Sequence, residues 1–133
     1  MPVNLDDLLG TTEPHATFHD ASLLALRIDY GSRDATLDWE LFAGDPDTSE
    51  RKRTRRARLK LSGLVFWEVE PFHDAGELPD LADDGPLTAL NLPRAMELSR
   101  NIPPGALAWY LYFSNWNAFA YCCARTAEVE WPD

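Results

Sequence analysis

Apolar residues recur at every second position between Ser22 and Phe42, and this period is the feature that most constrains the fold. Successive side chains of a β-strand point to opposite faces, so a period of two is typical of strands that bury one face. The residues on the apolar face are Leu24, Leu26, Ile28 and Tyr30 in the first stretch and Ala35, Leu37, Trp39 and Leu41 in the second. The segment GSRD between the two stretches supplies a turn. We therefore expect an antiparallel hairpin.

Charge favours one register for this hairpin. A two-residue turn places Asp29 opposite Asp34, whereas a four-residue turn places Arg27 opposite Asp38. Unlike charges that face each other across two strands stabilise the pair, and like charges destabilise it. We therefore expect the four-residue turn.

A third, longer strand is expected from Ala57 to Val69. One of its faces is apolar throughout, while the other becomes apolar only from Leu64 onward. Gly63 stands where this change occurs, and a glycine inside a strand often marks a bulge or a bend.

The last third of the chain alternates again, in the segments ALAWYLYFS, AFAYCCA and AEVEW. A short helix is expected near residues 92–100, because Asn91 can cap it and Pro93 suits its first turn. Adjacent strands with no helices alternating between them indicate an all-β class. We expect an antiparallel sandwich or open barrel of about six to seven strands, with this one short helix.

The chain has 133 residues, a length that suits one domain spanning residues 1–133. Within this domain we expect a loosely packed lead-in at 1–16, a basic loop at 43–56 and an acidic loop at 71–90. The acidic loop shows no periodicity, and long loops of this kind are functional or mobile.

The net charge of −10 argues against nucleic acid and an anionic membrane surface as partners, because both attract Lys and Arg. It permits a protein partner of opposite charge. No apolar run approaches the roughly 20 residues of a membrane span, and the N-terminus does not resemble a signal peptide. Cys122 and Cys123 are adjacent and follow no metal-binding or disulfide pattern, which favours a cytoplasmic protein with no metal and no cofactor.

Six of the eight residues in RKRTRRAR, at 51–58, are basic. Such a run binds an anion or forms a solvated loop. No aromatic residue interrupts the run, and the rest of the chain would repel a polyanion, so we expect the solvated loop. Its expected counter-charges are Asp74, Glu77, Asp80, Asp83 and Asp84.

The pair His19 and Asp20 stands just before the first strand. A histidine oriented by a carboxylate can act as a general base or a metal ligand, but it needs further partners. The FHD triplet recurs at 72–74, so His73 is one such partner. No established catalytic motif is present, and we therefore expect no catalytic residue and no metal ligand. We expect a structural corner in which Phe18 enters the core, with His19 and Asp20 retained as candidate binding residues.

Four of the five tryptophans lie in phase with apolar neighbours on expected strands, which predicts that they belong to the core. Trp116 is the exception, because it lies in the turn segment SNWN. An exposed tryptophan is a frequent anchor of protein interfaces, so Trp116 is the third candidate binding residue.

Four segments together resemble a class of small bacterial proteins of unknown function. They are FHDASLLALRIDY, ATLDWELF, RLKLSGLVFWEV and LYFSNWNAFAYCCARTAEVEW. Members of this class share an F-H-D-[AS] strand entrance, and one branch resembles the immunity protein 50 family, whose members are predicted to neutralise bacterial toxins. Leu61 departs from the phenylalanine expected in the central strand. The resemblance implies an all-β binding protein and implies no catalytic residues.

The leading expectation is a non-enzymatic protein-binding domain, an immunity-type inhibitor that occludes a toxin through an acidic surface. One alternative is a small hydrolase or ligand-binding sandwich that uses His19, Asp20 and His73. A further alternative is a structural protein that pairs with itself as a homodimer.

Overall fold

The computed structural model describes residues 4–72 and 76–132. The described part of the chain contains one α-helix, α1, which spans Pro93–Ser99, and two short 3₁₀ helices, η1 and η2, which span Leu5–Leu8 and Leu87–Ala89. The strands are β1 (Thr17–Asp29), β2 (Asp34–Phe42), β3 (Thr54–Val69), β4 (Leu81–Pro86), β5 (Leu107–Phe113) and β6 (Ala118–Glu130).

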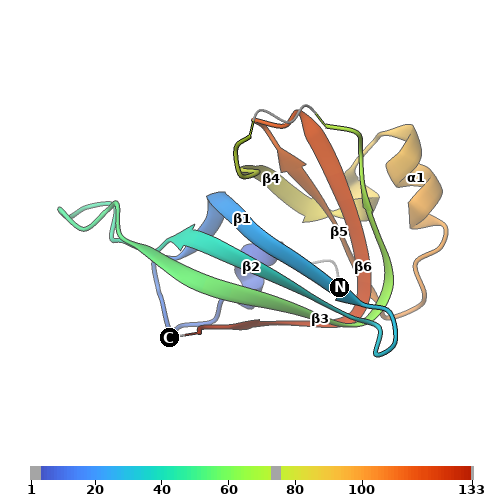
Figure 1. Ribbon diagram of the computed structural model, residues 1–133, viewed down its shortest axis with the longest axis horizontal. Helices are drawn as coiled ribbons and strands as arrows, with labels where there is room; N and C mark the ends of the chain where they lie inside the picture. Colours follow the sequence, from blue (N-terminus) through green and yellow to red (C-terminus); the bar gives the residue numbers. More distant parts are fainter. Residues whose placement is uncertain (1–3, 73–75, 133) are drawn as a thin grey trace.

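The six strands form one antiparallel sheet in the order β1-β2-β3-β6-β5-β4. This sheet curls into a half-barrel, so that its two terminal strands, β1 and β4, approach each other (Figure 1). Ser22 and Asp80 form a bridge between these two edges. The all-β class with one short helix is therefore confirmed, and of the two expected architectures the open barrel is the one observed. The helix begins at Pro93 as expected, although Leu92 rather than Asn91 occupies the capping position.

The register of the first hairpin differs from the expected one. Asp29 lies opposite Asp34, and Arg27 lies opposite Thr36. The Asp29 carboxylate accepts hydrogen bonds from the backbone N–H groups of Gly31 and Ser32, at 2.9 and 3.1 Å. These bonds stabilise the charged form of Asp29 and lower its pKa. Because β-strands twist, Arg27 still reaches Asp38, with a nitrogen–oxygen distance of 3.3 Å.

Gly63 adopts a φ of +65°, and the pairing of β3 with β6 shifts between Leu64 and Phe66. The bend expected near this glycine is therefore present. The sheet separates two apolar clusters, one inside the half-barrel and one on the outer face under α1 and η2. The first half of β3 contributes Leu59 and Leu61 to the inner cluster.

The N-terminal segment is not loosely packed. Leu5 is completely buried in the inner cluster, and Leu9 is almost completely buried. The Asp6 carboxylate accepts the backbone N–H of Phe18 at 2.7 Å, and the Leu5 N–H donates to Asp84 at 2.9 Å. The expectation for residues 1–16 was wrong for the described part, because Leu5 and Leu9 insert between the two edges of the half-barrel.

The two expected loops are shorter than the sequence indicated. β3 begins at Thr54, so the connection between β2 and β3 covers only residues 43–53. The acidic stretch 71–90 contains β4 and η2. The strand LADDGP has no alternating pattern because it lies at the edge of the sheet.

Among the described residues, the ion pairs of the basic run involve other acids than the expected Glu77, Asp80, Asp83 and Asp84, and the expected Asp74 lies outside the described residues. Arg53 and Arg55 both bind the carboxylate of Glu13, and Arg58 binds Asp38 at 2.9 Å. In Figure 1 the 43–53 connection projects at the left, away from the acidic stretch that leads into β4. Among the residues that the structure describes, no helix is long and apolar enough to cross a membrane.

Candidate functional site

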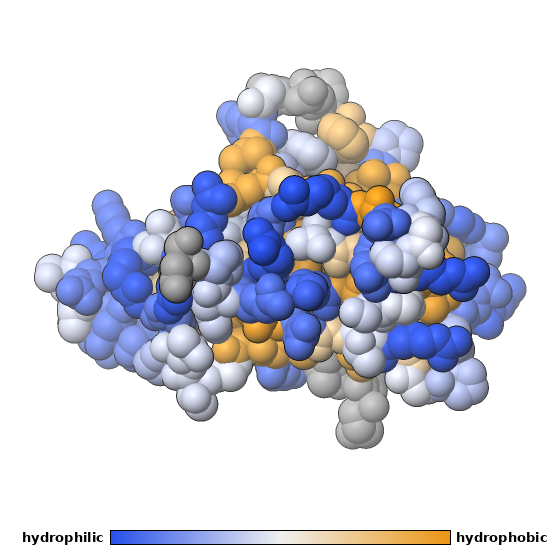
Figure 2. All heavy atoms as spheres, turned by 60° about the horizontal axis from the view of Figure 1, so that its bottom comes forward, coloured by the Kyte–Doolittle hydropathy of each residue, from blue (hydrophilic) through white to orange (hydrophobic). Residues whose placement is uncertain are grey.

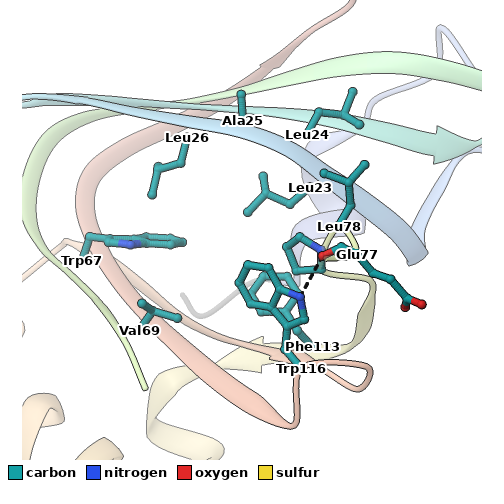
Figure 3. A pocket seen from close by; sticks show the side chains of 11 residues that line it. Leu23, Leu24, Ala25, Leu26, Trp67, Val69, Glu77, Leu78, Phe113 and Trp116 are labelled. Atoms are coloured by element: carbon teal, nitrogen blue, oxygen red, sulfur yellow. Dashed lines mark hydrogen bonds between the residues drawn. The ribbon is translucent and has the colours of Figure 1, made fainter. Parts of the chain in front are cut away.

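An apolar groove of about 290 Å³ opens inside the half-barrel, beside β1. Figure 3 shows Leu23 and Leu26 projecting from β1 toward Trp67 of β3 and Trp116 of the β5–β6 turn. The remaining lining residues are Leu24, Ala25, Val69, Glu77, Leu78, Pro79 and Phe113. Three strands and two connections therefore build this groove, and it is almost entirely hydrophobic.

The bend at Gly63 accounts for the far wall of the groove. Beyond this glycine, β3 continues past the β1–β2 hairpin and pairs only with β6. Its apolar face, with Trp67 and Val69, therefore lines the open concave side of the half-barrel. The alternating pattern assigned these residues to the core, and instead Trp67 is half-buried and Val69 is exposed.

Trp116 forms the rim of the groove at the β5–β6 turn. Its ring stacks on Phe72, with 4.0 Å between the ring centroids and an angle of 8° between the planes. Its Nε1–H donates a hydrogen bond to the backbone carbonyl of Glu77 at 3.0 Å. The expectation of an exposed tryptophan is therefore corrected: Trp116 is half-buried, because Phe72 and the chain at Glu77 pack against it.

His19 and Asp20 lie outside the groove, at the start of β1. Their side chains are 69% and 65% exposed, and His19 Nε2 lies 3.5 Å from the Asp20 carboxylate. Phe18 is fully buried, as the corner interpretation requires. His73, the third member of the hydrolase alternative, falls outside the described residues. The described part of the chain contains no group of three or more His, Cys, Asp or Glu side chains placed to hold a metal.

Several titratable groups with shifted pKa values lie away from the groove. Burial raises the pKa of the Cys122 thiol to about 12, which makes it a poor nucleophile. Burial and the neighbouring Asp83 raise the pKa of Tyr110 to about 12. The Arg94 guanidinium lowers the pKa of Glu68, with which it forms a two-pronged ion pair. The Cys122 thiol is buried, and Tyr110 and Glu68 are paired with Asp83 and Arg94. Such environments are typical of structural contacts.

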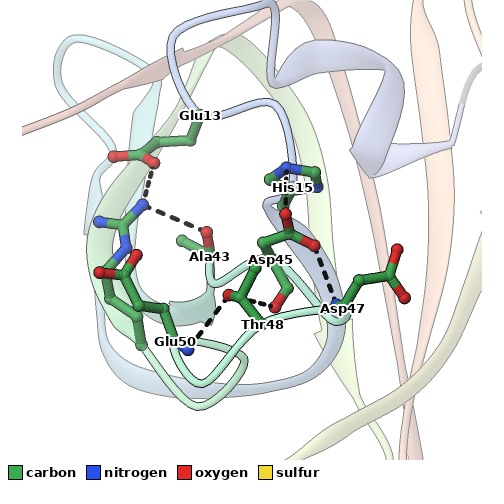
Figure 4. Close-up of polar contacts among 8 residues, drawn as sticks. Glu13, His15, Ala43, Asp45, Asp47, Thr48 and Glu50 are labelled. Atoms are coloured by element: carbon green, nitrogen blue, oxygen red, sulfur yellow. Dashed lines mark hydrogen bonds and ion pairs between the residues drawn. The ribbon is translucent and has the colours of Figure 1, made fainter.

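A second polar cluster fixes the connection between β2 and β3 (Figure 4). His15 Nε2 lies 3.7 Å from the Asp45 carboxylate, which also accepts the N–H of Asp47 at 2.9 Å. The Thr48 hydroxyl donates to the Asp45 carbonyl and accepts the N–H of Glu50. Each of these contacts joins the loop to itself or to the N-terminal segment. The cluster therefore orders the loop, which is a structural role.

The outer face of the sheet carries paired charges. Arg27 and Arg58 both contact Asp38, and Lys60 lies 3.4 Å from Glu130. Figure 2, which brings the lower side of Figure 1 forward, shows a largely hydrophilic surface with small apolar patches. The groove therefore differs sharply in polarity from this charged part of the outer face, whereas the part under α1 and η2 carries the second apolar cluster.

Comparison with known proteins gives no relative from which a function could be transferred: no protein-family model matches the chain, and no curated protein or solved structure shows significant similarity to it.

Proposed function

We propose that this chain is a non-enzymatic protein-binding domain that uses the groove beside β1 as its contact surface. Within that class, the sequence resemblance supports an immunity-type inhibitor that covers a toxin. The observation that carries the proposal is the groove itself, an open apolar concavity bordered by Trp67 and Trp116. Tryptophans in concave apolar surfaces are the residues on which protein interfaces most often depend.

The size and lining of the groove favour a protein side chain over a metabolite. Its volume lies at the lower end of small-molecule sites, which span roughly 300–1,000 Å³. Such sites place several polar groups around the ligand, whereas Glu77 is the only charged residue among the described ones that line the groove. An apolar side chain of a partner fits this environment.

Charge supports a partner that is basic where it meets the groove. Glu77 lines the groove, and it belongs to a stretch from Glu70 to Asp84 whose sequence contains six acidic residues and no Lys or Arg. Complementary charge accelerates association and selects among partners. The free, buried thiols of Cys122 and Cys123 support a reducing compartment, and we place the protein in the cytoplasm.

Co-expression with the products of adjacent genes tests this function. We expect one of these products to be toxic alone, to lose its toxicity when the chain is present, and to co-elute with it in size-exclusion chromatography. The variant Val69→Lys places a charge on an exposed position of the groove and is expected to abolish protection. The matched control is Met96→Lys, on the exposed surface of α1 across the sheet, and it should protect fully.

Two results would contradict the proposal. One is that no adjacent gene product binds the chain. The other is a complex that forms equally well with Val69→Lys, because the contact surface would then lie elsewhere. A chain that forms only a homodimer by light scattering supports the structural alternative instead.

A further inference from the structure

The two terminal strands of the sheet differ in how their outer edges are protected. β4 is six residues long, ends at Pro86 and carries Asp83 and Asp84, which are features that block the addition of another strand. β1 is thirteen residues long and contains neither proline nor lysine from Ser22 to Asp29, where Arg27 and Asp29 alternate with apolar residues and the pairing with β2 shifts between Leu23 and Ala25. The edge of β1 is therefore the one that can accept a further strand.

Among the described residues, those that bond to the outer edge of β1 lie near its middle. Ser22 bridges to Asp80, and the Leu23 N–H donates to the Pro79 carbonyl at 3.0 Å. From Leu24 to Asp29, β1 pairs with β2 on one side, and no described strand lies on its other side. Backbone groups of an edge strand point alternately toward its partner and away from it, so alternate residues of this stretch present hydrogen-bonding groups along the mouth of the half-barrel.

The free edge and the apolar groove adjoin each other. Leu24, Ala25 and Leu26 belong to this edge and also line the groove. A peptide that binds as an added strand gains affinity from main-chain hydrogen bonds and specificity from side chains that enter pockets at every second position. The structure supplies both components at one place.

We infer that the occupant of the groove is an extended segment of a partner protein, which adds to the edge of β1 as a seventh strand. Its side chains alternate, so that apolar ones enter the groove between Leu26, Trp67 and Val69. This inference rests on the proposed protein-binding function and specifies the form that the partner takes.

Charge sets the composition of the segment at one end. In Figure 3 the Glu77 carboxylate points out of the groove on the Trp116 side. Nearby, the Asp80 carboxylate accepts a hydrogen bond from the hydroxyl of Ser22, a neutral donor that does not compensate its charge. A segment with Lys or Arg at this end and apolar residues farther along β1 is complementary to the site.

A selection experiment tests the inference with the full chain and an unbiased set of ligands. The immobilised chain is used to select from a random dodecapeptide library displayed on phage, with Val69→Lys as the counter-selecting variant. We expect enriched peptides to carry apolar residues at alternate positions and a net positive charge. No enrichment over the counter-selection, or enrichment of acidic or helix-patterned peptides, would overturn the inference.

The binding mode is tested with synthetic versions of the most enriched peptide. Methylation of alternate backbone nitrogens blocks one edge of an added strand, so one of the two methylated peptides should bind at least about tenfold more weakly while the other binds normally. Amide exchange of those N–H groups in residues 24–29 that do not bond to β2 should slow at least about tenfold on binding, with α1 unchanged. Equal binding of both methylated peptides, or unchanged exchange at 24–29, excludes strand addition.

These outcomes separate the inference from the function on which it rests. If selected peptides add to β1 but no adjacent gene product is toxic, strand addition is supported and the immunity role is rejected. If a toxin forms a complex with the chain but amide exchange at 24–29 does not change, protein binding is supported and strand addition is rejected. Protection of 24–29 by a second copy of the chain at high concentration identifies self-pairing as the use of this edge and overturns the heterologous partner.

Discussion

At the corner before β1, the chain turns through Asp20 with a φ of +62°, in the left-handed region. The pairing of β1 with β2 shifts between Thr17 and Ser22, so this conformation belongs to a β-bulge. Just before Asp20, Phe18 is buried and His19 is exposed, and Ala21 after it is buried again. The His-Asp pair therefore has a sufficient structural explanation: the short polar side chain of Asp20 tolerates a conformation that most residues avoid.

Substitutions at Asp20 test this explanation. Asp20→Ala should lower the free energy of unfolding by about 1 kcal/mol, because a Cβ without a polar group is costly in the left-handed region. Asp20→Asn and Asp20→Gly should stay within about 0.5 kcal/mol of the parent, because both residues tolerate this region. Urea denaturation measures all three. The control His19→Ala should change little, and a loss there equal to that of Asp20→Ala would contradict a purely conformational role.

Glu13 is the only described charged residue that is largely buried, at 8% exposure, and no pattern in the sequence signalled this role. Hydrogen bonds from Arg53 and then Arg55 lower its pKa below the ordinary value of 4.5. A carboxylate whose pKa is lower in the folded state stabilises the fold above its unfolded pKa. That stabilisation disappears as the pH falls through the folded pKa.

The variant Glu13→Gln should therefore be less stable than the parent near neutral pH, and the difference should shrink as the pH falls below about 4.5. Urea denaturation across this pH range measures the difference. Glu50→Gln, in the exposed part of the same loop, is the matched control and should show a smaller change. A deficit of Glu13→Gln that is constant across the range would show that its carboxylate charge is unimportant.

At the scale of elements, the sequence predicted those strands whose two faces differ in polarity. β2 and β5 alternate clearly, and both lie close to their expected positions. β4 was missed because LADDGP lies at an edge, where neither face needs a continuous apolar pattern. The predicted hairpin register was wrong because it depended only on charges directly across the strands. The backbone N–H groups of the turn, which satisfy Asp29, decide the register instead.

The bend in β3 depends on Gly63, and Gly10 provides a matched comparison. Both glycines have positive φ values, of 65° and 68°. A Cβ on Gly63 would lie 2.9 Å from Cβ of Arg125, whereas nothing lies within 4 Å of a Cβ on Gly10. Gly10→Ala should therefore cost about 1 kcal/mol from conformation alone, and Gly63→Ala at least about 2 kcal/mol. Equal losses in urea denaturation would show that the close contact with Arg125 relaxes freely.

At the scale of the whole molecule, the curvature of the sheet determines which residues of an apolar face are buried, and the alternating pattern alone does not predict this. The same apolar face of β3 is buried at Leu61 and exposed at Val69, because the β1–β2 hairpin covers only the first half of the strand. A sequence records which face is apolar, but not how far neighbouring strands extend over it. The residues that line the groove on β3 therefore have the alternating pattern of core residues, and the sequence did not predict the groove.

The N-terminal segment closes the other end of the half-barrel. β1 and β4 meet at Ser22 and Asp80, and η1 fills the space on one side of this bridge. The segment bonds both edges, through Asp6 to the start of β1 and through Asp84 to β4. The half-barrel thus has one end closed by its own chain and one end open as the groove, so the lead-in is a structural part of the barrel.

Truncation and a paired point substitution test this closure. Leu5→Ala should lower the free energy of unfolding by about 2–5 kcal/mol, because it leaves a cavity in the inner cluster. Leu8→Ala, on the same turn but only half-buried, should cost about 1 kcal/mol or less. Deletion of residues 1–12 should cost more than Leu5→Ala, because it also removes Leu9 and the Asp6 carboxylate that accepts the N–H of Phe18. If instead the deletion left the urea midpoint unchanged, the contacts of Leu5 and Leu9 would contribute nothing to stability, and the sheet would hold its curvature without an internal plug.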